Sequence, residues 1–371
     1  MKKLIKLLSL LLFAGFIFTA CEDDSSDDQM QPEDAKQMLD QMETEMSQDL
    51  SLMQDAPGME ALSVLMNLSD PFGAKKSTEP TVVLDQIYGL VSSNKESLAT
   101  QSEAFDFDSK TGTYTWNIEL ERWSIEAGNP NDAIIIFFPA NGESTENDAM
   151  LKILDVQETP YTDEYQETEY LPTLIEAELY INDELVAELN MTASYDQDGD
   201  PTQMSVNYSV VPFNMDLTLT SSATSANIAY SLSSNNETLM GAELGVTFTD
   251  QTQETPASIN GSLTYRDYEV RADADIVAIQ QKMENMDPES SEEEFLNSIN
   301  DEIDAGLYQV STGDKVVNIE LGYVQGDSGQ EMGVVFVFAD GSTENAIPYL
   351  EGFISQIETL MTELGLDESD F

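Results

Sequence analysis

The feature that most constrains the fold is a long stretch in which apolar and polar residues alternate. The alternation begins at Ile175 and continues to Ile276, interrupted only by short turn segments such as Asn182-Asp183. A period of two residues puts successive side chains on opposite faces of a strand. The pattern therefore predicts a meander of about eight antiparallel strands with one apolar and one polar face. Such a sheet must bury its apolar face on another layer.

The alternation also predicts which side chains belong to each face, because a one-residue error in register would reverse them. We expect burial of Leu179, Leu189, Met215, Leu217, Ile228, Val246, Leu263 and Val270. We expect exposure of Glu178, Glu188, Thr218 and Asp273.

Helical spacing occurs on both sides of the alternating stretch. Apolar residues recur at steps of three and four in 33–53 and 59–68, and a third helix is expected from about Pro80. Ser291 and Glu294 indicate another helix start, and 346–364 carries a last apolar stripe. The sequence thus predicts an α+β fold. A large twisted antiparallel β-meander sheet would be packed on one face by N-terminal and C-terminal amphipathic helices.

The predicted organisation is a signal peptide, a tether and a single α+β domain. Their expected ranges are 1–20 for the signal peptide, 21–32 for the acidic lipidated tether and 33–371 for the domain. Within the domain we expect helices over 33–99, the sheet over 105–278, and a helix, strands and a helix over 288–371.

The segment between the first helices and the meander also predicts strands. The expected ranges are 105–108, 113–125 and 133–139, and the acidic stretch 157–170 is expected to form a long surface loop. Trp116 and Trp123 would lie on opposite faces of a single regular strand, so the spacing does not support a stacking platform for a sugar.

An internal repeat brackets the meander. The residues of 107–149 recur in 312–346: Thr-Gly and Asn-Ile-Glu-Leu return at a fixed offset, and IIIFFPANGESTENDA matches VVFVFADGSTENA. Unrelated strands share alternation but not a tract such as Ser-Thr-Glu-Asn, so we interpret the match as a duplication. Each copy predicts strand, turn, strand, strand and an N-capped helix, in related positions of one sheet.

The N-terminus has the three parts of a secretory signal: basic residues, an apolar run over 7–18, and small residues before Cys21. The run is too short to cross a bilayer of about 30 Å as a helix. Phe18-Thr19-Ala20-Cys21 resembles the lipobox of bacterial lipoproteins, although Phe18 replaces the usual aliphatic residue. The resemblance implies cleavage before Cys21 and lipidation of that residue. The alternative is an ordinary secretory signal with a chance cysteine.

Five acidic residues follow Cys21 within the next seven positions. We interpret them as a solvated, self-repelling tether. The cluster also resembles the surface-export signal of lipoproteins from the Bacteroidetes group. That resemblance implies an outer-membrane protein, anchored by lipid and facing the cell exterior.

The charge of the chain excludes several partners. There are 71 acidic and 14 basic residues, giving a formal net charge of −57 at pH 7. Nucleic acid is excluded because phosphate binding needs a basic footprint, and docking on anionic headgroups is excluded for the same reason. Cationic partners and divalent ions are favoured. Adaptation to a saline habitat is an alternative explanation of the acidity.

The chain contains no histidine and a single cysteine. Catalytic triads with histidine, histidine general bases and histidine-ligated zinc are therefore excluded. Once Cys21 is lipidated, no thiolate nucleophile remains. We predict no catalytic residue and no resident cofactor.

One segment, DQDGDP, places Asp196, Asp198 and Asp200 at alternate positions, as at the start of a calcium-binding loop. The remaining positions do not fit, since Pro201 stands where the loop needs glycine and Asn207 where it needs glutamate. A polar hairpin turn is the favoured interpretation, with weak Ca²⁺ binding as the alternative.

Three functions remain open from the sequence. The first is a non-enzymatic binding or scaffolding role at the cell surface. The second is a carrier of a hydrophobic ligand between helices and sheet, a layout that loosely resembles lipoprotein carriers of the LolA kind. The third and weakest is a hydrolase that depends on carboxylates or a metal.

Overall fold

The computed structural model describes residues 30–54, 56–68, 104–162, 168–235, 237–250, 255–285, 292–326 and 329–349. The predicted signal peptide, Cys21, nearly all of the tether, the helix expected from Pro80 and most of the helix expected over 346–364 lie outside these residues.

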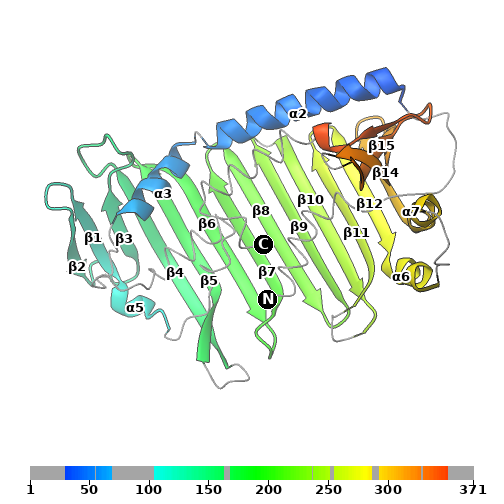
Figure 1. Ribbon diagram of the computed structural model, residues 1–371. Helices are drawn as coiled ribbons and strands as arrows, with labels where there is room; N and C mark the ends of the chain where they lie inside the picture. The colour runs from blue at the N-terminus through cyan, green and yellow to red at the C-terminus, as the bar shows by residue number, and fades with distance from the viewer. Residues whose placement is uncertain are drawn as a thin grey trace.

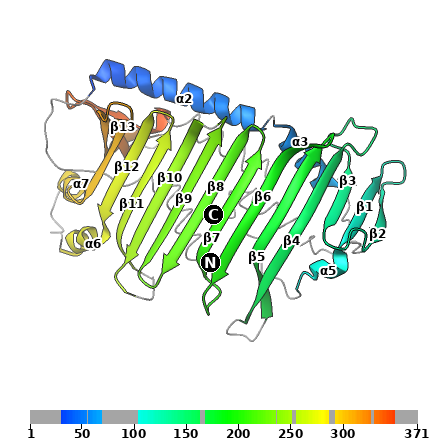
Figure 2. The same ribbon diagram turned by 180° about the vertical axis from the view of Figure 1, so that it is seen from behind.

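The described strands form one sheet of 16 strands (Figures 1 and 2). Their order follows the chain from β16 back to β3 and then ends with β1 and β2. Neighbouring strands are antiparallel except β1 and β3, which pair in parallel. The strands are β1 (Gly112–Asn117), β2 (Arg122–Ala127), β3 (Ile134–Phe138), β4 (Ala149–Thr162), β5 (Thr168–Ile181), β6 (Glu184–Tyr195), β7 (Pro201–Val210), β8 (Phe213–Ser222), β9 (Ser225–Ser234), β10 (Glu237–Phe248), β11 (Pro256–Tyr265), β12 (Tyr268–Asp275), β13 (Ile303–Gln309), β14 (Lys315–Gly326), β15 (Gly329–Val337) and β16 (Thr343–Asn345). The predicted antiparallel meander is confirmed.

The described helices lie at the margins of this sheet (Figure 1). In Figure 1, α2 and α3 follow one another along the upper ends of the strands, and α6 and α7 lie beside β11 to β14. The helices are α2 (Pro32–Gln54), α3 (Pro57–Asn67), α5 (Phe107–Lys110), α6 (Ile276–Asn285) and α7 (Glu292–Asn300), with a 3₁₀ turn η1 (Ile347–Tyr349). No helix in the described part of the chain is long and apolar enough to cross a membrane.

Polar side chains attach α2 to the sheet at two points. Asp49 accepts hydrogen bonds from the Tyr265 hydroxyl at 2.7 Å and from Arg266 Nη2 at 2.8 Å. Nearer the start of the helix, Lys36 forms an ion pair with Glu344. Between these points Leu39 and its apolar neighbours are buried against β11 to β15. The helix is therefore held by both polar and apolar contacts.

Two sequence predictions near the N-terminal end of the sheet are wrong. The expected strand 105–108 is replaced by the start of α5, because the Asp106 carboxylate caps the turn by accepting from Ser109 N. The expected strand 113–125 is a hairpin, since the chain turns at 118–121 and Glu121 has a φ of 47°.

The expected loop 157–170 is largely strand. β4 and β5 continue through it as a pair, with Thr159 opposite Leu171 and Tyr161 opposite Glu169. The acidic composition of this segment therefore did not prevent strand pairing. Leu171, directly after it, is buried. Only 163–167 lie outside the described residues.

The two repeat copies lie near opposite ends of the sheet, one across β1 to β4 and the other across β14 to β16. A buried phenylalanine closes each copy's strand, Phe138 as the last residue of β3 and Phe338 directly after β15. Both copies return to the core at a buried alanine, Ala149 or Ala346. The N-capped helix predicted after each copy is wrong for the first, where Ala149 begins β4. In the second, the described chain shows only η1.

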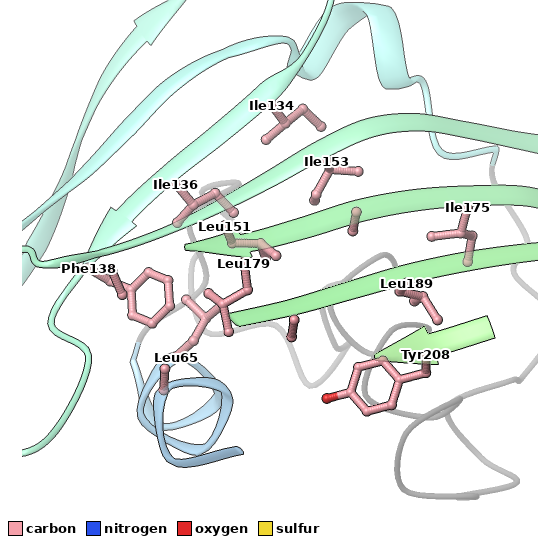
Figure 3. Close-up of a cluster of buried hydrophobic side chains, with 14 of the residues drawn as sticks. Leu65, Ile134, Ile136, Phe138, Leu151, Ile153, Ile175, Leu179, Leu189 and Tyr208 are labelled. Atoms are coloured by element: carbon pink, nitrogen blue, oxygen red, sulfur yellow. The ribbon is translucent and has the colours of Figure 1, made fainter. Parts of the chain in front are cut away.

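Buried hydrophobic residues of the described chain fall into two large clusters and three small ones. The largest joins α3 to β1 and to β3 through β7, and Figure 3 shows Leu65 of α3 beside Leu179 and Phe138. The second joins α2 to β11 through β15 and includes Leu39, Leu307 and Phe336. The strands between these clusters, β8 to β10, lie in the middle of the sheet and carry two of the small clusters.

Candidate functional site

One cross-strand row of side chains shows how burial changes along the apolar face. Strand register places eleven residues in this row, each opposite the next. In order they are Val156, Ile175, Met191, Val206, Leu217, Tyr230, Ala242, Leu263, Val270, Leu307 and Val317. The first four and the last two are buried, whereas the five in the middle are only partly buried. Along this row, burial is therefore lowest in β8 to β12, although the same face of these strands also carries buried residues such as Leu232 and Val246.

One of the two neighbouring rows repeats the pattern, whereas the other is buried at Leu232, Tyr265 and Tyr268. Ile228, Leu244 and Ala272 face the same side and are also partly buried. We call these residues together the central apolar surface. It consists of Leu217, Ile228, Tyr230, Ala242, Leu244, Leu263, Val270 and Ala272.

The central apolar surface carries almost no polarity. Seven of its eight side chains are aliphatic, and Tyr230 is its one ionisable group. Loss of water around the phenol raises the pKa of Tyr230 to about 12, so the ring is neutral at ordinary pH. The five strands that contribute to its main row, at a spacing of about 4.8 Å, give it a width of roughly 20 Å. Such a surface can bind apolar groups but offers nothing for acid–base or nucleophilic chemistry.

The opposite face of the same strands is polar and internally hydrogen-bonded. Asp216 accepts from Asn207 at 2.6 Å and from Asn214 at 3.0 Å. Glu178 and Glu188, which were expected to be exposed, are both partly buried. Glu178 accepts from the Tyr180 hydroxyl at 2.8 Å, and Glu188 accepts from the Asn190 side chain at 2.7 Å. These contacts occupy the carboxylates, so the two faces of the sheet differ sharply in character.

The three candidate calcium ligands lie in the turn between β6 and β7. The Asp196 carboxylate accepts hydrogen bonds from the backbone N–H of Asp198 at 2.9 Å and of Asp200 at 3.0 Å. Gly199 has a φ of +77°, and a Cβ there would come within 3.0 Å of the Tyr161 ring. Within the described ranges, no three acidic or thiol side chains converge to hold a metal ion. The geometry is that of a hairpin turn, and Ca²⁺ binding stays a prediction.

Two carboxylates have raised pKa values, but they do not form a pair. Burial raises the pKa of Glu158, whose Oε2 accepts from Phe105 N at 2.7 Å and whose buried Oε1 has no hydrogen-bond partner. Burial also raises the pKa of Glu320. Glu158 is in β4 and Glu320 in β14, and nine strands lie between β4 and β14 in the sheet. They cannot act together on one bond, as a hydrolase with two carboxylates requires.

The two tryptophans do not behave as the sequence predicted. Because the chain turns at 118–121, Trp116 and Trp123 are paired across β1 and β2 and share one face. Their ring centroids are 5.1 Å apart in an edge-to-face arrangement. Trp116 is buried and Trp123 partly buried, so the pair contributes to packing at this end of the sheet.

Comparisons of the chain with family models, with curated proteins and with solved structures found no match.

The central apolar surface was not predicted from the sequence. Of the eight side chains expected to be buried, three are, namely Leu179, Leu189 and Val246. The other five are partly buried: Met215, Leu217, Ile228, Leu263 and Val270. Alternation predicted the face of each residue correctly, with Thr218 and Asp273 exposed on the other side. It contains no signal for how much of that face is covered.

Proposed function

We propose that the chain is a lipid-anchored, non-enzymatic protein of the cell envelope that binds a hydrophobic ligand at its central apolar surface. The single observation that supports ligand binding is the burial pattern of one row, in which five partly buried residues lie between buried ones. Helices packed over the two margins of this face would leave its centre for the ligand. Such an arrangement supports the carrier alternative over the scaffold.

The chemistry of the surface favours a long acyl chain as the ligand. An acyl chain is uncharged, flexible and apolar along its length, and the surface offers aliphatic side chains over roughly 20 Å. Covering partly exposed Leu and Val side chains contributes about 25 cal/mol for each Å² of apolar area removed from water. A polar or charged ligand would gain nothing comparable there, since Tyr230 supplies the surface's single hydroxyl.

The location follows from the N-terminal sequence. We propose that Cys21 is lipidated, that the acidic tether holds the domain away from the outer membrane, and that the domain faces the cell exterior. A hydrophobic ligand presented by a neighbouring membrane or by a host surface would then reach the sheet without passing through a lipid bilayer.

Two substitutions that each replace an alanine by phenylalanine test ligand binding. Ala242 lies in the central apolar surface, and Ala229 lies one strand away on the polar face; both are partly buried. Ala242→Phe should fill the surface and weaken binding of a fluorescent fatty acid roughly tenfold, since one aromatic ring displaces several ligand contacts. Ala229→Phe adds the same volume on the other face and should leave the dissociation constant unchanged.

Three results would count against the proposal. The first is that the unsubstituted chain shows no saturable binding of the fatty acid. The second is that both substitutions change the dissociation constant equally. The third is that Ala242→Phe unfolds the protein, as expected if the core there is filled. A melting curve of each variant separates the last result from the others.

A further inference from the structure

The strand β2 ends the described sheet at one side. It pairs with β1 over six consecutive residues without a bulge. At the other end of the sheet, β16 has three residues. Natural sheets protect their edges with short strands, proline, charged side chains or bulges. β2, with the sequence RWSIEA, has no proline, lysine or bulge, and its two charges, on Arg122 and Glu126, are of opposite sign. No other described strand pairs with it.

The hydrogen-bond pattern shows which backbone groups of β2 point outward. Gly128 N donates to Thr111 O at 2.8 Å, and these two residues continue the β1–β2 register. Backbone groups alternate in direction along a strand, so those of Ser124 point toward β1, whereas those of Trp123 and Ile125 point toward the outer edge.

The side chains of β2 are divided between the two faces of the sheet. Trp123 and Ile125 lie opposite Trp116 and Tyr114 of β1, on the apolar face. Ile125 is 50% exposed, and Leu120 in the adjoining turn is 57% exposed. The polar face of β2 is formed by Arg122, Ser124 and Glu126, all exposed.

The side chains of β2 are complementary to those of a second β2 that runs antiparallel to it. We propose that β2 is a dimerisation edge, at which β2 of a second copy of this chain pairs antiparallel with Ser124 opposite Ser124. In that register Arg122 of each copy faces Glu126 of the other on the polar face. Trp123 of each copy faces Ile125 of the other on the apolar face. The sheets of the two copies become continuous across the two-fold axis.

The register also satisfies the backbone. Trp123 and Ile125, whose backbone groups point outward, form the hydrogen-bonded pairs across the new interface. Ser124 and the charged residues form the non-hydrogen-bonded pairs, in which side chains approach most closely. A shift by one residue would place inward-pointing groups opposite outward-pointing ones, and a shift by two would place Glu126 opposite Ser124.

The contact is small, so the dimer is weak in solution. One strand pair buries less than the roughly 1,200–2,000 Å² of a standard stable interface. We therefore expect a dissociation constant of about 1 μM or higher. Attachment of both copies to one membrane would raise their effective concentration and favour pairing.

A charge swap tests the register in the full chain, purified in detergent and examined by sedimentation at low salt. Arg122→Glu and Glu126→Arg each place like charges opposite one another at two sites and should raise the dissociation constant roughly tenfold. An equimolar mixture of the two variants restores both attractions, and should recover dimers that neither variant forms alone. Because each variant is the other's control for folding, recovery on mixing cannot come from a stability effect.

A disulfide tests the two-fold axis. Across a non-hydrogen-bonded pair the two Ser124 Cα atoms lie about 4.5 Å apart, within the range that a disulfide spans. In a Cys21→Ala background, Ser124→Cys should form a covalent dimer under mild oxidation. Thr218→Cys, exposed on the same face in β8, is the matched control and should not.

The proposal is overturned if the unsubstituted chain stays monomeric at every concentration, if mixing the charge variants recovers no dimer, or if Ser124→Cys cross-links no faster than Thr218→Cys. A dimer that is insensitive to both substitutions would use another surface, and would also overturn it.

Discussion

Replacing either of two leucines on the same face of the sheet by alanine should lower the free energy of unfolding, but by very different amounts. Leu189 of β6 is 2% exposed and belongs to the largest buried cluster, whereas Leu263 of β11 is partly exposed in the central apolar surface. Both are leucines in interior strands of the meander. The two variants share residue type and interior strand position. Their comparison therefore tests how far burial of the side chain sets the loss of stability.

The magnitudes follow from what each truncation removes. Leu189→Ala loses the transfer free energy of the buried carbons and leaves a cavity, which together cost about 2.7–5 kcal/mol. Leu263→Ala loses only part of the transfer free energy, at about 0.8 kcal/mol for each fully buried methylene, and leaves no closed cavity. We expect a cost near 1 kcal/mol for Leu263→Ala, so the two variants should differ by roughly 2 kcal/mol.

Urea unfolding followed by circular dichroism measures both costs, with Thr218→Ala on the polar face as a control expected to change stability by less than about 0.5 kcal/mol. Adding a saturating fatty acid should increase the cost of Leu263→Ala, because the bound chain then covers that side chain, and should leave the cost of Leu189→Ala unchanged. Equal costs for the two leucines without ligand would refute the reasoning, since they would show that the centre of the face is as well covered as its margin.

Two further predictions concern the anchor and the charge. Mass spectrometry of the native N-terminus should find Cys21 acylated and 1–20 removed, and Cys21→Ala should release the protein from membranes; an unmodified Cys21 would contradict the lipid anchor. The melting temperature should rise with NaCl, because salt screens repulsion in a chain with a formal charge of −57, and a flat or falling series would contradict this. If the β6–β7 turn binds Ca²⁺, CaCl₂ at equal ionic strength should add a further increase that Asp196→Asn removes. Asparagine keeps the acceptor for the N–H groups of Asp198 and Asp200, so the turn itself should persist.

The sequence by itself determined the strands of the meander and the face of each residue. Period-two alternation is a local property: Leu217 and Thr218 must point to opposite sides of any strand that contains them, whatever lies above it. The start of α7 at Glu292 was local as well, whereas α3 begins at Pro57, two residues before the predicted start at Met59. The helix α6 was missed because its apolar spacing directly follows β12, although Asp275 caps it by accepting from Ala278 N.

Tertiary structure decided what alternation cannot encode. Whether 113–125 is one strand or a hairpin depended on the turn at 118–121, and that turn moved Trp123 beside Trp116 and created the β2 edge. The degree of burial along the apolar face depended on where α2 and α3, distant in sequence, lie relative to each strand. Leu189 and Leu263 carry the same local signal, and only the packing of remote segments makes one of them core and the other surface.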